Sequence, residues 1–160
     1  MFQRWKKKAK NEVFRNIASG KVLSLDNMPD KVFSQRMMGD GYALEPLNET
    51  IYAPSSGTMT AVFPTGHAYG IVTAEGLEIL IHLGVDTVQL QGKGFVSYVK
   101  QGDAVKQGDR LATMDLNYIK EQGKSTLSAI LFTSGEKIVL LKENEFVDQN
   151  TEQIFAFIAE

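Results

Sequence analysis

Short apolar runs alternate along the chain with turns rich in glycine, proline and aspartate. Runs of aromatic and β-branched residues bounded by such turns are typical of β-strands. The pattern predicts strands at residues 21–25, 42–44, 58–63, 67–71, 77–83, 95–99, 128–132, 137–141 and 153–158. Strands at such short intervals predict an all-β fold, an antiparallel β-sandwich or barrel, rather than an α/β fold.

Two segments predict very short helices within this β pattern. Pro29 suits the first turn of a helical or turn segment that extends to Ser34, because its fixed φ is already helical. Asp115 can cap a helix over residues 116–122, and Gly123 would end it. We therefore expect one or two very short helices beside the strands.

The chain is organised around residues 63–88, which hold both of its histidines, His67 and His82. Two apolar runs flank a turn signal at Glu75-Gly76, and such a pair is most simply a β-hairpin. A two-residue turn would make the histidines diagonal neighbours on one face, roughly 7–8 Å apart. A loop over residues 73–76 would place them directly opposite, and only an odd-length loop or a bulge would separate them.

Composition places the chain among single globular domains without cysteine chemistry. It has 160 residues, 43% of them hydrophobic, and no cysteine, which excludes disulfides and cysteine-based zinc sites. The net charge is −2, although residues 1–10 carry five basic residues and no acid. We expect a basic, flexible segment at 1–16 and one domain at 17–160. An acidic body argues against nucleic acid as a partner.

Phe2 and Trp5 lie among the lysines of the first residues. This composition suits weak contact with an anionic membrane, and it suits a solvated, frayed terminus equally well. No apolar run is long enough to cross a bilayer, and no signal-peptide core follows the first residues, so a cytoplasmic location is expected.

The histidine pair is the strongest candidate for chemistry. On the predicted strand 77–83, His82 lies on the face away from the main apolar row, and Gly84 leaves space beside its ring. Neutral imidazole is a good nucleophile near pH 7 because its pKa is near 6.5. Attack on a phosphoryl group needs little beyond positioning and charge stabilisation. Thr65 could fix His67 as a donor, and backbone amides at residues 84–86 could add others. Asp86 would orient a donor or contact a cation of a partner.

The order T-x-H-x(14)-H-x-G-x-D-T-V, from Thr65 to Val88, resembles the glucose-type enzyme IIA (EIIA type 1) of the bacterial sugar phosphotransferase system. Further matches are PDKVFSQRMMGDGYALEP at 29–46, APSSGTM at 53–59, GKGF at 92–95 and GDAVKQGDRLATMDL at 102–116. Together they extend from residue 17 to about residue 158. The resemblance implies a β-sandwich of the duplicated hybrid motif type with a shallow active face.

The resemblance also implies roles for individual residues. His82 aligns with the histidine that is phosphorylated on Nε2, His67 with the partner histidine needed for onward transfer, and Thr65 with the threonine that orients it. The donor would be the phosphocarrier protein HPr, and the acceptor a cysteine on the IIB domain of a sugar permease. Family members dock through a set of apolar residues around the active site. The matching positions here are Val32, Phe33, Met37, Met38, Phe63, Leu80 and Val88. Such a phosphocarrier requires no cofactor.

Other functions fit the sequence less well. His67 and His82 could hold zinc as a regulatory module or metallohydrolase, but a catalytic zinc site usually has three protein ligands. A zinc ion shared with a partner protein is compatible with two. The segment 102–111 resembles part of a biotinyl or lipoyl carrier hairpin, yet Asp115 stands after Met114 where that carrier has lysine. Gly123-Lys124-Ser125 ends like a P-loop, but Tyr118 replaces the glycine that this motif requires.

Overall fold

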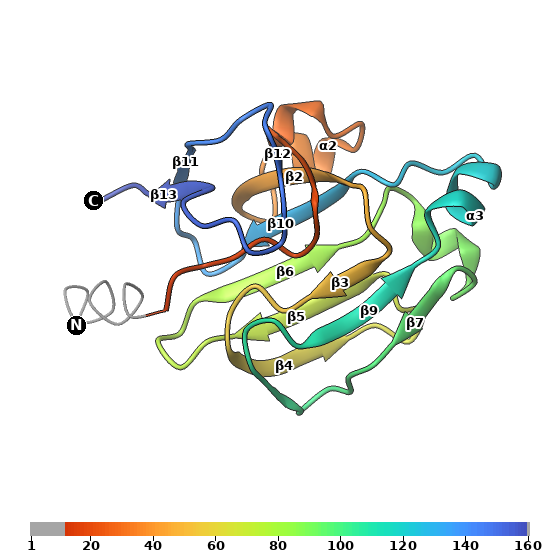
Figure 1. Ribbon diagram of the computed structural model, residues 1–160, viewed down its shortest axis with the longest axis horizontal. Helices are drawn as coiled ribbons and strands as arrows, with labels where there is room; N and C mark the ends of the chain where they lie inside the picture. The colour runs from red at the N-terminus through yellow and green to blue at the C-terminus, as the bar shows by residue number, and fades with distance from the viewer. Residues whose placement is uncertain (1–11, 160) are drawn as a thin grey trace.

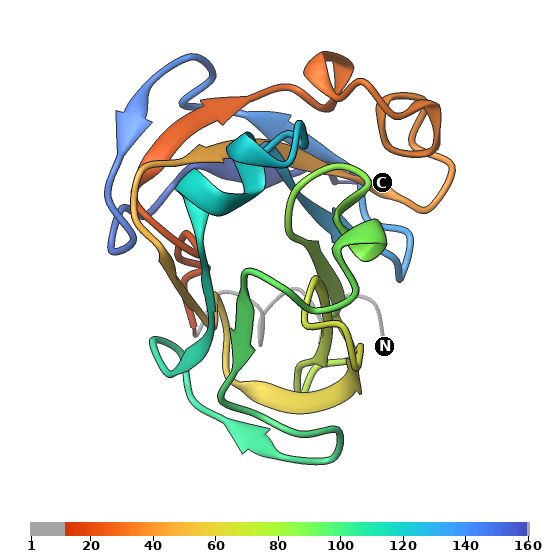
Figure 2. The ribbon, with the colours of Figure 1, turned by 90° about the vertical axis from the view of Figure 1, so that its right-hand side faces the viewer.

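The computed structural model describes residues 12–159, and its strands form antiparallel sheets around one main core (Figures 1 and 2). The largest sheet has eight strands in the order β12-β1-β2-β10-β6-β5-β4-β8. Its strands are β1 (Gly20–Leu23), β2 (Asp40–Pro46), β4 (Gly57–Val62), β5 (Ala68–Val72), β6 (Glu78–His82), β8 (Ala104–Val105), β10 (Ser128–Phe132) and β12 (Phe146–Val147). The smaller sheets contain β3 (Thr50–Tyr52), β9 (Arg110–Met114) and β7 (Phe95–Ser97), and β11 (Ile138–Leu140) with β13 (Phe155–Phe157). The predicted all-β sandwich is confirmed.

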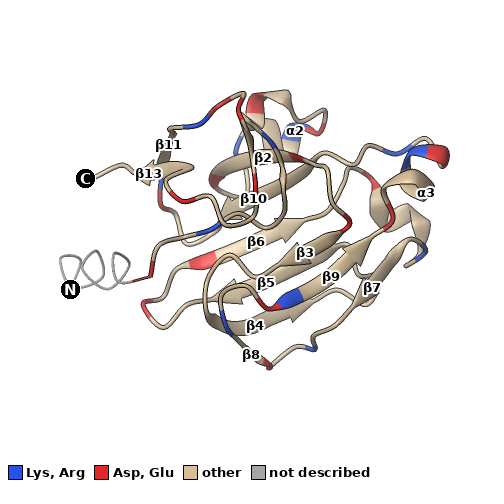
Figure 3. Cartoon of the chain, viewed as in Figure 1, with Lys and Arg blue, Asp and Glu red and all other residues tan. Residues whose placement is uncertain are grey.

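Charged residues lie mainly in the loops and near the ends of the strands (Figure 3). The strands β4, β5 and β10 contain no charged residue, whereas β6 begins with Glu78 and β9 begins with Arg110. Because a charge is costly to bury without a partner, this distribution lets the middle of the large sheet pack on apolar side chains.

Side chains alternate between the two faces of β6, and this alternation places His82. Ile79 and Ile81 are 1% and 0% exposed and belong to the main core. Leu80 and His82 point to the other face and are half-buried. A second, smaller core lies on that face, where Leu25, Met28 and Phe33 pack over Ala129 and Leu131 of β10, among others. Hydrophobic burial on both faces therefore fixes the register of β6.

Short helical turns cover or connect the sheets. They are η1 (Leu25–Asn27), α2 (Lys31–Ser34), η2 (Thr87–Leu90) and α3 (Leu116–Glu121). The caps predicted for α3 are confirmed: Asp115 Oδ1 accepts from the Tyr118 N–H over 3.0 Å, and Gly123 has φ +75°. Pro29 lies outside α2, because Asp30 is the N-cap and accepts from the Val32 N–H over 2.8 Å.

Residues 12–16 pack on the domain, although we expected them to belong to a flexible N-terminal segment. Glu12 accepts hydrogen bonds from the backbone N–H and the hydroxyl of Ser56, over 2.7 and 2.6 Å. The Phe14 ring lies 4.8 Å from that of Phe155, centroid to centroid, and Asn16 is 1% exposed. The packed domain therefore includes these residues. The predicted membrane contact of Phe2 and Trp5 lies outside the described residues. No helix within residues 12–159 is long and apolar enough to span a membrane.

Candidate functional site

The histidine rings meet at one end of the β5–β6 hairpin, although neither expected register is present. Ala68 pairs with His82 and Val72 with Glu78, so residues 73–77 form an odd-length loop. Thr73 closes this loop: its hydroxyl accepts from the Leu77 N–H, and its own N–H donates to the Leu77 carbonyl. Both register predictions were therefore wrong. The imidazole centroids of His67 and His82 nevertheless lie 5.2 Å apart, with the ring planes at 77°.

His67 reaches His82 because it precedes the regular part of β5. It lies in a bend after the turn at Phe63–Gly66, in which the Gly66 N–H donates to the Phe63 carbonyl over 2.7 Å. Gly66 has φ +72°, a conformation that favours glycine, and a Cβ there would lie 2.9 Å from Phe95 Cβ. The bend ends the strict alternation of faces at the start of the strand. It also places Thr65 Oγ1 2.6 Å from Nδ1 of His67.

His82 is fixed in one tautomer by the backbone. Its Nδ1 lies 2.9 Å from the carbonyl oxygen of Gly84, which can only accept a hydrogen bond. Nδ1 therefore carries the proton of the neutral ring, and Nε2 keeps its lone pair. His82 is half-buried whereas His67 is 5% exposed, so another protein can approach His82 more readily.

The first two backbone N–H groups of the loop after β6 already donate hydrogen bonds within the protein. The Gly84 N–H donates to Ser128 Oγ over 3.1 Å, and the Val85 N–H donates to the Ser125 carbonyl over 3.0 Å. The expectation that these two amides are free to bind phosphate was therefore wrong. Thr87 Oγ1 donates to the Leu83 carbonyl and closes the same loop.

Both histidines are held neutral at physiological pH. Burial lowers the pKa of His67 to about 4, and the neighbouring His82 adds to this effect. Burial also lowers the pKa of His82, while the Gly84 carbonyl and the carboxylates of Asp30 and Asp86 act in the opposite direction. The neutral rings suit a nucleophile at Nε2, and the carboxylates favour positive charge on the ring of His82.

Aromatic rings enclose the pair on both sides. The centroid of Phe33 lies 4.8 Å from that of His82, and the centroid of Phe63 lies 5.4 Å from that of His67. Phe33 is 4% exposed, so it supports the His82 ring from the second core and offers little surface to a partner. Phe63 is 43% exposed and lies beside the site at the surface.

The remaining predicted docking residues differ in their exposure. Leu80 is half-buried against the second core. We call the exposed members of the predicted set the apolar rim: Val32, Met37, Met38, Phe63 and Val88, between 38% and 68% exposed. Three of them belong to α2 or the turn that follows it, and Val88 belongs to η2, which starts after Asp86.

Two contributors to the site were not predicted from the sequence. Asp30 acts on the charge of His82 across the fold, and Ser128 of β10 orients the Gly84 backbone. The position of Asp30 directly after Pro29 suits a helix N-cap, but it does not indicate an effect on His82. Both interactions act between segments far apart in the sequence, so no local motif indicates them.

The residues present do not form a metal site by themselves. Across residues 12–159, no group of three or more His, Cys, Asp or Glu side chains is placed to hold a metal ion. With Nδ1 of each histidine already hydrogen-bonded, the pair can offer two Nε2 ligands at most. A zinc ion would need its remaining ligands from another molecule.

Comparison with known proteins identifies the fold and the family. The family "phosphoenolpyruvate-dependent sugar phosphotransferase system, EIIA 1" matches residues 12–138. The chain is 48% identical over 127 residues to the glucose-specific EIICBA component of Streptococcus pneumoniae serotype 4, covering 79% of this chain and 18% of that protein. It is 47% identical over 124 residues to the glucosamine-specific EIICBA component of Bacillus subtilis, covering 78% of this chain and 20% of that protein.

The chain thus spans about a fifth of the length of these curated relatives. A solved structure, the glucose permease IIA from Mycoplasma capricolum, superposes with a TM-score of 0.83 at 38% identity. This match covers 90% of this chain and 94% of that one. The chain belongs to the EIIA 1 family of the phosphoenolpyruvate-dependent sugar phosphotransferase system, which carries phosphoryl groups in sugar uptake.

Proposed function

We propose that His82 accepts a phosphoryl group from the phosphohistidine of HPr on Nε2 and passes it to a cysteine of a sugar-permease IIB domain. The observation that carries this proposal is the hydrogen bond of the His82 Nδ1–H to the Gly84 carbonyl, which leaves Nε2 as the nucleophile. The proximity of His67, with centroids 5.2 Å apart, supplies the second group that transfer needs.

In the first step the lone pair of Nε2 attacks the phosphorus, and the P–N bond of phospho-HPr breaks with its electron pair returning to the donor imidazole. The proton on Nδ1 of His82 stays in place, so the ring gains positive charge as the new bond forms. The Gly84 carbonyl accepts from Nδ1, and the carboxylates of Asp30 and Asp86 stabilise this charge. Burial opposes it, which keeps the phosphorylated ring a reactive donor.

His67 then stabilises the bound phosphoryl group. If the Thr65 hydroxyl donates to Nδ1 of His67, Nε2 of that ring carries the hydrogen and can donate to a phosphate oxygen. In the second step a cysteine thiolate of the IIB domain attacks the phosphorus, and the electron pair of the P–N bond returns to Nε2 of His82. Neither step uses a cofactor.

Docking of both partners would use the apolar rim. Its members are exposed, Phe63 lies beside His67, and methionines such as Met37 and Met38 suit a surface that repacks against two different proteins. Asp86 is exposed and would contact a cationic group of a partner. HPr and the IIB domain are reached from the cytoplasm, so this is where the domain would work. A zinc ion bridging the histidines and a partner would need the other tautomer of His67, in which Nδ1–H donates to Thr65 Oγ1 and Nε2 is free.

The test is phosphorylation with phosphoenolpyruvate, enzyme I and HPr. We expect one acid-labile phosphate per chain, none in His82→Ala, and retained labelling in His67→Gln with slow transfer to the IIB domain. A full label in His82→Ala would refute the assignment of the acceptor. Normal donation by His67→Gln would remove His67 from the mechanism.

A further inference from the structure

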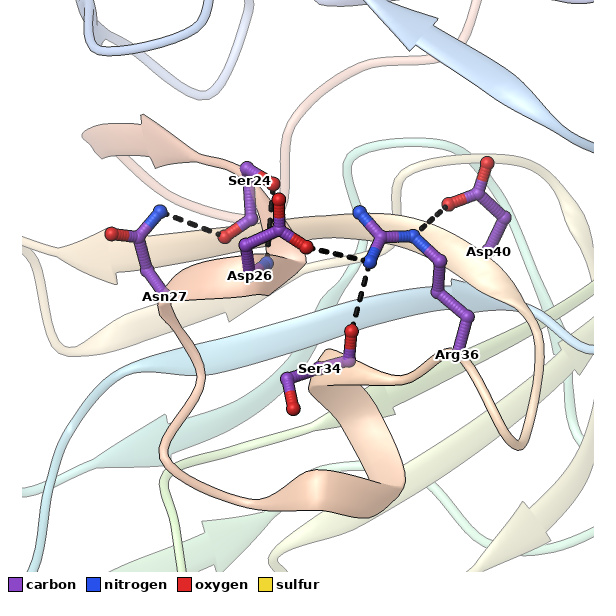
Figure 4. A network of polar contacts seen from close by, with 6 residues as sticks. All are labelled: Ser24, Asp26, Asn27, Ser34, Arg36 and Asp40. Carbon is purple, nitrogen blue, oxygen red and sulfur yellow. Dashed lines mark hydrogen bonds and ion pairs between the residues drawn. The ribbon is translucent and has the colours of Figure 1, made fainter.

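A charged network fixes the segment that follows α2 (Figure 4). The guanidinium of Arg36 donates through Nη1 to Asp26 Oδ1 and to the Ser34 carbonyl, both over 2.8 Å, and through Nε to Asp40 Oδ1 over 3.1 Å. One side chain thereby joins η1, the end of α2 and the first residue of β2. The phosphoryl-transfer mechanism proposed above does not involve Arg36.

Both acidic residues of this network are held in place, Asp26 through its backbone and Asp40 through its carboxylate. Ser24 Oγ accepts from the Asp26 N–H over 3.1 Å and caps η1. Asp40 Oδ2 accepts from the Ile138 N–H over 2.9 Å, so Asp40 also ties the network to β11. Asp40 is the more sheltered partner, with 18% of its side chain exposed against 75% for Asp26. The arginine therefore binds to fixed acceptors, and Asp40 gives the stronger anchor.

The backbone of Arg36 is strained in a way that needs compensation. Arg36 has φ +57° at the position just after the helical turn, where glycine is usual. A non-glycine residue persists in this left-handed conformation only where its surroundings hold it there. The side-chain hydrogen bonds of Arg36 do so, and they lower the pKa of Asp26. The strained residue is where the chain turns from α2 toward β2.

The segment fixed in this way supports the reacting ring. α2 is only four residues long, too short to be stable without tertiary contacts. It carries Phe33, whose ring packs 4.8 Å from that of His82, centroid to centroid. We propose that Arg36 is a positioning residue for phosphoryl transfer, which holds Phe33 against His82 and so keeps Nε2 aimed outward. This inference rests on the proposed function of His82.

The test separates the side chain from the backbone strain. Arg36→Gly keeps a residue that favours positive φ and removes the side chain with its guanidinium. We expect the packing of Phe33 to loosen and water to reach the His82 ring. The pKa of His82 then rises toward its ordinary value, because the neighbouring side chains of Asp30, Asp86 and His67 are not altered. A small misplacement of a reacting group costs about 10- to 100-fold in rate, and we expect kcat/KM for phosphorylation by phospho-HPr to fall about tenfold.

Two further variants frame this result. Arg36→Lys keeps the charge but replaces the planar guanidinium, which reaches its acceptors through two nitrogens, by a single compact ammonium. We expect an intermediate rate and an intermediate pKa for His82. Arg110→Ala removes an arginine that stacks on Tyr98, 4.6 Å from its ring centroid, on the three-stranded sheet. This control has the same loss of charge and should leave both readouts unchanged.

In Arg36→Gly, an unchanged pKa of His82 together with a phosphorylation rate within twofold of wild type would overturn the positioning role. The pKa of His82 is measured by NMR and needs no phosphoryl transfer. If phospho-HPr does not label the wild-type protein, the proposed function is refuted. The pKa measurement still tests the positioning role of Arg36 in that case. If Arg36→Gly does not fold, Arg36→Lys supplies the same comparison: an unchanged rate and pKa there would overturn the proposal, and intermediate values would support it.

Discussion

The carbonyl oxygen of Gly84 accepts from Nδ1 of His82 over 2.9 Å, so the conformation of one backbone residue leaves Nε2 free to react. Gly84 has φ +77°, and a Cβ there would lie 2.5 Å from Thr87 Cγ2 and 2.7 Å from the Ser125 carbonyl oxygen. We expect Gly84→Ala to lower the free energy of unfolding by about 3 kcal/mol through strain and overlap. Phosphorylation of His82 should slow about tenfold or more. Urea unfolding and labelling rates measure the two effects.

Gly123→Ala is the matched control for this prediction. Gly123 has φ +75°, nearly the same backbone conformation, but a Cβ there would have no neighbour within 4 Å among the described residues. Its substitution should cost about 1 kcal/mol of stability from strain alone and leave the labelling rate unchanged. Equal losses of stability in the two variants would show that the overlap at Gly84 has no effect.

Acidification should destabilise the fold through His67. Its pKa is about 4 in the folded protein, against an ordinary value of 6.5, so between these values the unfolded chain binds a proton that the folded chain does not. The contribution of neutral His67 to the free energy of unfolding is therefore fully present above about pH 6.5 and is lost as the pH drops toward 4. We expect the urea midpoint to fall between pH 7 and pH 5, and to fall less in His67→Gln. Identical pH profiles for the two proteins would contradict the lowered pKa.

The strand pattern predicted much of the fold because burial follows strict alternation. Ile79 and Ile81 point into the main core and His82 points away from it, as a period of two requires. β3, β8, β9 and β12 were not predicted, since β3, β8 and β12 have only two or three residues and β9 follows directly on a Gly-Asp turn. The register failed for a different reason: the Thr73 side chain closes a longer loop than Glu75-Gly76 suggests.

The site was predictable as far as single residues carry it. The spacing and resemblance brought His67, His82 and Thr65 together, and the structure places the three in contact. The electrostatic effect of Asp30 and the packing of Phe33 depend on how the segment before β2 folds over the sheet. Such contacts between distant segments leave no periodic or motif signal in the sequence.

The carboxylate of Asp30 should assist phosphorylation through charge alone. Asp30→Asn keeps a side chain that can still cap α2, so it removes the charge without removing the cap. We expect the pKa of His82 to fall and its phosphorylation to slow by roughly two- to fivefold at low salt, the range of a partly exposed charge interaction. The difference should shrink as salt is added. A slower rate that is independent of salt would indicate a structural cause instead.

Phosphorylation of His82 should raise the pKa of His67. In the free protein, burial and the neighbouring ring lower the pKa of His67 to about 4. A phosphoryl dianion on Nε2 of His82 would lie beside the His67 ring, whose centroid is 5.2 Å away, and an opposite charge at that range raises a histidine pKa by about 1–3 units.

We therefore expect NMR titration of the ring carbons to give a clearly higher pKa for His67 in the phosphorylated protein. The matched control is His82→Gln, which removes the neighbouring imidazole without adding a phosphate and should raise this pKa only slightly. A His67 pKa that stays near 4 after phosphorylation would mean that the ring does not face the phosphoryl group, and its role in onward transfer would then need another explanation.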